Sequence, residues 1–200
     1  KKFDKQLGAA ASDGEPEEEF KFSDLKYILT SQAFWIVALL CVLYYSAIFP
    51  FQRFAANMLQ CNLDGLTATQ AADIFRWFPI GAAAITPLLG YYLDRKGKGA
   101  TMLIGGALLL IICHLVFAFV LPETKSEPIA YATIVILGLS FALVPASLWP
   151  SVPKIVDEKI LGSAYCLIFW IQNFGLSLTP LLLGSVLSST NANNPAVIAA

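Results

Sequence analysis

Charged residues make up only 14% of this 200-residue chain, histidine occurs once and cysteine four times. A single histidine gives no basis for a histidine-bound metal or a set of histidine-activated nucleophiles. The chain also has no HExxH motif and no pair of carboxylates deep in an apolar run. The cysteines lack the spacing of a metal site or a disulfide framework. We therefore expect no catalytic residues, no metal and no cofactor, and a membrane enzyme is disfavoured.

A surplus of basic charge is absent too, because the net charge is −1. Nucleic-acid-binding domains usually carry a strong positive balance. We therefore expect no nucleic acid among the partners of this chain.

Long apolar runs dominate what remains. Hydrophobic residues make up 57% of the chain, and its mean hydropathy is +0.67. A helix of about 20 apolar residues crosses the roughly 30 Å hydrocarbon layer of a bilayer. The sequence predicts an all-α membrane protein with five full spans and the start of a sixth, at about 27–58, 69–93, 100–121, 129–153, 160–187 and from about 195.

The first 24 residues differ from the rest because they are polar and contain an acidic run at 15–19. A segment with so few apolar residues cannot bury enough surface to fold alone. We expect 1–24 to be a cytoplasmic linker and 25–200 a transmembrane helical bundle, with a short interfacial helix near 20–27. The chain opens on Lys1 without an initiator methionine or a signal peptide, so we expect a piece of a longer protein.

Basic residues are distributed unevenly over the turns between the predicted spans. Cytoplasmic turns of membrane proteins carry the excess of Lys and Arg. One side holds Lys21, Lys26, Arg95, Lys96, Lys98, Lys154 and Lys159. The other side holds Arg53, Arg76 and Lys125. This asymmetry predicts that the linker and the turns near 95 and 156 face the cytoplasm.

The turn between the second and third spans carries a motif, with Gly90, Asp94, Arg95, Gly97 and Lys98 in the pattern G-x-x-x-D-R-x-G-K. It resembles a signature of the major facilitator superfamily. The resemblance implies the C-terminal six-helix half of that fold, with the N-terminal half as a partner. It also implies that these five residues form a cytoplasmic latch. A tight turn at the membrane surface is the alternative.

A narrower resemblance covers most of the chain from Phe22 onward. The stretches 44–51, 138–140, 148–150, 161–165 and 171–175 look like the domain-containing protein 1 group of this superfamily, whose animal members are lysosomal dipeptide transporters. The chain departs from that group at Gln52, Arg53, Asp73 and Arg76.

Aromatic or polar side chains within the spans are candidates to line a substrate cavity: Tyr45, Phe49, Gln52, Arg53, Arg76, Trp149, Tyr165, Gln172 and Asn173. Unpaired amides in hydrocarbon cost several kcal/mol, so Gln172 and Asn173 either face a cavity or bond between helices. Arg53 either meets a substrate carboxylate or extends to the membrane surface. Arg76 could instead pair with Asp73, three residues earlier.

Two more side chains have open roles. Trp149, before Pro150, either lines the cavity or fills it. His114 lies among apolar residues, where helix packing is favoured over a proton relay.

These features predict half of a secondary-active or facilitative transporter that moves a small polar organic solute by alternating access. Short peptides or amino-acid-like compounds are favoured by resemblance alone. The alternatives are a non-transporting receptor or scaffold on the same fold, or a sugar or organic-anion transporter. Short loops without glycosylation sequons favour a cell (inner) membrane, with the lysosomal membrane as the alternative.

Overall fold

The computed structural model of the chain describes residues 22–191, which form helices joined by short turns and contain no strand within that range. Most of the predicted linker and the predicted start of a sixth span near 195 lie outside the described residues. The fold is all-α, as the sequence predicts.

The short helix predicted near 20–27 corresponds to α2 (Phe22–Thr30), and the first predicted span corresponds to α3 (Gln32–Asn62), so the boundary between them lies at Ser31 rather than near 27. Ser31 separates them because its hydroxyl accepts a hydrogen bond from the Phe34 N–H at 3.3 Å and caps α3. Helix α3 then continues through Pro50, which is buried. Proline has no N–H to offer the carbonyl four residues earlier, so the Ser46 carbonyl loses its usual helical donor. The Ser46 hydroxyl is also buried without a partner.

The second predicted span is divided into α4 (Ala68–Phe75) and α5 (Trp77–Lys96). Thr67 begins α4 with a reciprocal capping box, in which its hydroxyl bonds the Gln70 N–H and the Gln70 side chain bonds the Thr67 N–H. The break at Arg76 has a local cause, because Pro79 cannot donate to the Phe75 carbonyl.

The remaining helices follow the other apolar runs. Helix α6 (Gly99–Leu115) continues through a π-helical turn, η1 (Val116–Val120), into α7 (Leu121–Thr124). Helix α8 (Glu127–Leu148) passes into a 3₁₀ segment, η2 (Trp149–Lys154), that contains Pro150 and Pro153. After η3 (Glu158–Ile160) the chain enters α9 (Leu161–Asn191).

Within residues 22–191, four helical stretches are long and apolar enough to cross a membrane: Gln32–Asn62, Gly99–Thr124, Glu127–Lys154 and Glu158–Val186. They coincide with four of the five predicted spans. The remaining one, the second predicted span at 69–93, is divided between α4 and α5, and its crossing of the membrane stays a prediction.

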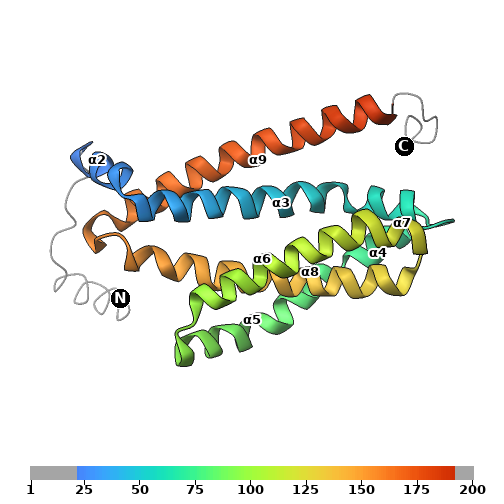
Figure 1. Cartoon of the computed structure of the whole chain (residues 1–200), viewed down its shortest axis with the longest axis horizontal. Coiled ribbons are helices and arrows are strands. Elements are labelled where there is room, and N and C mark those ends of the chain that lie inside the picture. The colour runs from blue at the N-terminus through green and yellow to red at the C-terminus, as the bar shows by residue number, and fades with distance from the viewer. Residues whose placement is uncertain (1–21, 192–200) are drawn as a thin grey trace, which may run out of the picture.

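The turns rich in basic residues lie at one end of the bundle and the other turns lie at the opposite end, as the predicted orientation requires. Helix α2, the α5–α6 turn and the η2–η3 region lie at one end, on the left in Figure 1, and the α3–α4 and α7–α8 turns lie at the other. The motif turn and Lys159 therefore share an end. At the opposite end the Lys125 ammonium pairs with the Asp64 carboxylate at 2.7 Å.

The bundle consists of two packed groups. Helix α8 packs against α5 and α6, while α3 packs along α9 (Figure 1). Close contact in the first group depends on Gly138, where a Cβ atom would collide with the Phe78 carbonyl oxygen on α5. In the second group, a Cβ atom on Gly175 of α9 would come within 2.6 Å of the Ser46 hydroxyl on α3. Small residues at such crossings let helix backbones approach closely.

Candidate substrate site

Aromatic rings from four helical elements meet where the two groups of helices join. We call this set the aromatic seam; its members are Tyr45 and Phe49 on α3, Phe141 on α8, Trp149 at the start of η2, and Tyr165 and Phe169 on α9. At 1.5 Å per residue, Tyr45 lies about 20 Å along α3 from its start. The seam therefore lies near the middle of a membrane-spanning helix.

Trp149 is the centre of the seam. Its ring stacks on Phe169 with centroids 4.9 Å apart, and lies 6.2 Å from Tyr45 and 6.0 Å from Tyr165. Tyr45 in turn stacks on Phe49 at 5.5 Å. Tyr45 is buried, but Phe49 and Phe169 are 40% and 47% exposed. The seam thus presents two partly exposed phenylalanine rings beside hydrogen-bonding rings, of which Tyr45 is buried.

Three hydrogen bonds hold α3 and α9 to the α8–η2 segment. The Trp149 indole N–H donates to the Tyr45 hydroxyl at 3.0 Å, and the Tyr165 hydroxyl donates to the Trp149 carbonyl at 3.1 Å. The Tyr44 hydroxyl donates to the Ser140 carbonyl at 2.9 Å. Of these acceptors, the Trp149 carbonyl lacks its usual helical donor because Pro153, four residues later, has no N–H, so the Tyr165 hydroxyl bonds this part of the backbone from outside.

The predicted cavity residues on α9 divide into two environments. Gln172 is buried at the α3–α9 interface, where its side-chain oxygen accepts from the Cys41 thiol at 3.4 Å. Of the two alternatives that the sequence left open for Gln172, this contact is the hydrogen bond between helices. Asn173 is exposed and its amide donates to the Phe169 carbonyl one turn earlier, at 2.8 Å.

The predicted cavity arginines also differ. Arg53 lies on α3 two turns beyond Tyr45 and is exposed, with Gln52 half-buried beside it. Among the described side chains Arg53 has no ion-pair partner. Arg76 lies between α4 and α5, and its guanidinium pairs with the Asp73 carboxylate at 3.4 Å. Only Arg53 extends the face of the helix that carries Tyr45 and Phe49.

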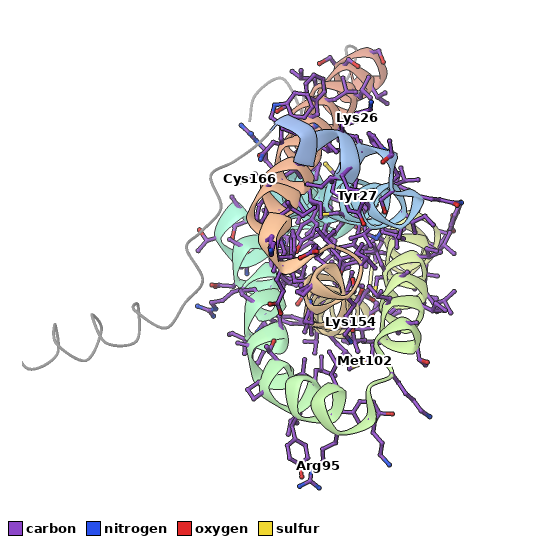
Figure 2. The ribbon with its side chains drawn as sticks, turned by 90° about the vertical axis from the view of Figure 1, so that its left-hand side faces the viewer. Lys26, Tyr27, Arg95, Met102, Lys154 and Cys166 are labelled. Carbon is purple, nitrogen blue, oxygen red and sulfur yellow. The ribbon has the colours of Figure 1, made fainter. Side chains whose placement is uncertain are left out.

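The motif turn ends α5 with Gly97 in the left-handed conformation, at φ 62°. Its N–H donates to the Leu93 carbonyl at 2.8 Å, which is the usual glycine termination of a helix. Arg95 places its guanidinium 4.5 Å from the centre of the Tyr91 ring. In Figure 2 the Arg95 side chain points away from the bundle. Gly90 has open space around its Cα, and Lys98 precedes α6.

His114 packs at the edge of α6. Its Nδ1 lies 2.9 Å from the Leu110 carbonyl oxygen, and its ring lies 5.1 Å from that of Phe51 on α3. This is the packing arrangement favoured from the sequence.

Four residues of the site were absent from the sequence-based set: Tyr44, Ser140, Phe141 and Phe169. Phe169 follows Tyr165 by one turn, so helical spacing was a usable signal. Phe141 and Ser140 had no such signal, because their partners on α3 lie far away in the sequence.

These observations define a multi-spanning helical membrane protein with an aromatic site between its helices. The family model described as Major Facilitator Superfamily matches residues 3–180, and the chain belongs to this family.

Curated relatives refine the comparison. The chain is 32% identical over 174 residues to the Lysosomal dipeptide transporter MFSD1 of Danio rerio, covering 87% of this chain and 36% of that protein. It is 30% identical over 176 residues to the Homo sapiens protein of the same name, covering 88% and 36%. The chain thus spans about a third of the length of these relatives.

Proposed function

We propose that this chain is the C-terminal half of a secondary-active or facilitative transporter that moves a small polar organic solute by alternating access. The N-terminal half of the same transporter completes the pathway, and the chain catalyses no reaction of its own. The observation that carries the proposal is the aromatic seam at mid-height, with Arg53 two turns further along α3. The likeness to dipeptide transporters supports short peptides and amino-acid-like compounds as the substrate class.

The spacing of the seam and Arg53 suits a zwitterion. Phe49 and Arg53 are one turn apart, about 6 Å along α3, and an extended dipeptide spans about 7 Å. The guanidinium can bind a carboxylate in a forked geometry. The faces of Phe49 and Phe169 attract an ammonium group or cover an apolar side chain. A dipeptide could therefore contact Arg53 and the ring of Phe49 at the same time.

Substrate-dependent counterflow tests this assignment. The complete transporter, reconstituted in liposomes, should accumulate labelled dipeptide against an unlabelled internal pool. We expect Arg53→Gln to weaken apparent affinity about tenfold or more, because it removes a charge-assisted hydrogen bond worth about 1.5–3 kcal/mol. Arg53→Lys should retain part of that affinity, since the charge remains.

Lys125→Gln is the matched control, because this basic residue is paired with Asp64 outside the seam. If Arg53→Gln keeps the full apparent affinity, Arg53 does not bind the substrate carboxylate. Binding of dipeptide without any counterflow would favour the receptor interpretation, and exchange of sugars or organic acids alone would favour the other transporter classes.

We also propose that Gly90, Asp94, Arg95, Gly97 and Lys98 act as a conformational latch, as the resemblance implies. The resemblance implies that the Asp94 carboxylate faces a helix N-terminus in the other half of the transporter, and such a contact contributes about 0.3–1 kcal/mol. Asp94→Ala should therefore shift the equilibrium between conformations by up to roughly fivefold and lower the counterflow rate without lowering expression. Glu158→Ala, an exposed carboxylate at the same end, is the control. If Asp94→Ala and Glu158→Ala have the same counterflow rate, the motif is only a tight turn at the membrane surface and not a latch.

The membrane in which the protein works is part of the proposal. The absence of sequons supports a cell (inner) membrane, whereas the relatives are lysosomal transporters, which supports the lysosomal alternative. Localising the complete, tagged protein in its native cell distinguishes the two.

A further inference from the structure

An apolar groove opens between α5 and α6 at the basic end of the bundle. Its volume is about 350 Å³, and its lining includes Leu89, Tyr92, Lys98, Met102, Gly105 and Leu143. Leu143 belongs to α8, which packs against both helices and closes the inner side of the groove. Figure 2 looks onto this end and places Met102 in the angle between α5 and α6.

The groove continues into the membrane-spanning part of α6. Gly105 lies about 9 Å along the helix from its first residue, at 1.5 Å per residue. A Cβ atom on Gly105 would meet nothing within 4 Å, so this glycine leaves the space open. Apolar walls at this depth favour a hydrocarbon occupant over a polar one.

The mouth of the groove is cationic. Lys98 lies at the start of α6 and Lys96 at the end of α5, both exposed. Neither has an ion-pair partner among the described side chains. Helix α6 also begins without a side-chain cap, which leaves its first amides able to bind an anion. Tyr92 on the same side is typical of the membrane interface.

We propose that this groove binds one anionic phospholipid, with an acyl chain along Met102 and Gly105 and the phosphate at Lys98. Basic pockets between helices at the cytoplasmic surface favour anionic headgroups over zwitterionic ones. The apolar walls distinguish a lipid from free phosphate, which has nothing to fill them. The inference requires membrane insertion but not transport, so it stands or falls separately from the proposed function.

Native mass spectrometry of the complete transporter in detergent, titrated with dioleoylphosphatidylglycerol, tests the proposal. We expect one tightly bound copy, and at least fivefold weaker binding of dioleoylphosphatidylcholine. Lys98→Gln should weaken the phosphatidylglycerol site about fivefold, the effect of one basic residue near a membrane surface. Gly105→Leu should weaken binding of both lipids by tenfold or more, because its side chain fills the groove.

Lys154→Gln is the control for general surface charge, because Lys154 is exposed at the same end but does not line the groove (Figure 2). It should leave the affinity unchanged. The proposal is overturned if Gly105→Leu binds phosphatidylglycerol as wild type does, or if Lys154→Gln loses as much affinity as Lys98→Gln. Equal thermal stabilisation by inorganic phosphate would also overturn it, since the acyl chain would then contribute nothing.

Discussion

Replacing Gly138 with alanine should separate α5 from α8 and sharply lower the thermal stability of the complete transporter. The added methyl group would collide with the Phe78 carbonyl oxygen and approach the Ala82 backbone nitrogen to 3.2 Å. Both obstacles are backbone atoms, which cannot rotate away as a side chain can. Overpacking usually costs about 1–3 kcal/mol, and we expect this variant at or above the top of that range.

The control for this prediction is Gly105→Ala on α6, where an added Cβ meets nothing within 4 Å. Alanine is favoured over glycine inside a helix by about 0.5–1 kcal/mol, so this variant should be neutral or slightly stabilised. Melting curves in detergent, followed by size-exclusion chromatography, measure both. A Gly138→Ala protein that melts with the wild type would show that α5 and α8 are not in close contact.

Trp149→Ala should abolish most counterflow as well as destabilising the fold. The substitution removes the ring that stacks on Phe169 and contacts Tyr45 and Tyr165. Truncating a buried tryptophan costs about 3–5 kcal/mol in protein cores, and the half-buried Trp149 should approach the lower value. Because the same ring joins α9 to η2, we expect the proposed substrate site to be lost with it.

A double-mutant cycle separates the hydrogen bond of Trp149 from its packing. Trp149→Phe keeps an aromatic ring but loses the N–H that donates to the Tyr45 hydroxyl, and Tyr45→Phe removes the acceptor. If that bond matters, the two substitutions together should cost less than the sum of the single costs, with a coupling of about 0.5–1.5 kcal/mol. Strict additivity in melting and counterflow would mean that the bond contributes nothing.

Much of the fold was predictable from local pattern. Apolar runs located the long helices, because hydropathy is a property of the residues in the helix itself. The break at Arg76 was missed and the one at Ser31 was placed about four residues early, although Ser31 and Pro79 are local signals. Neither interrupts hydropathy, which was the property used to define the spans.

The site was less predictable. Tyr45, Phe49 and Arg53 follow one another at intervals of four residues and so lie toward one face of α3, where Phe49 and Arg53 are exposed. Helical spacing could not predict which other helices pack against that face of α3. Gln172 and Asn173 are adjacent in the sequence, yet one is buried against Cys41 and the other is exposed.

The sequence by itself determined a helical membrane chain, its alternating turns and its basic end, because hydrophobicity, helix geometry and charge act over a few residues. Only the tertiary structure brought Trp149 to Tyr45 and left the groove between α5 and α6. Those contacts join residues on different helices, and they depend on which faces pack together. That choice is made by side-chain shape, as at Gly138 and Gly175, rather than by local pattern.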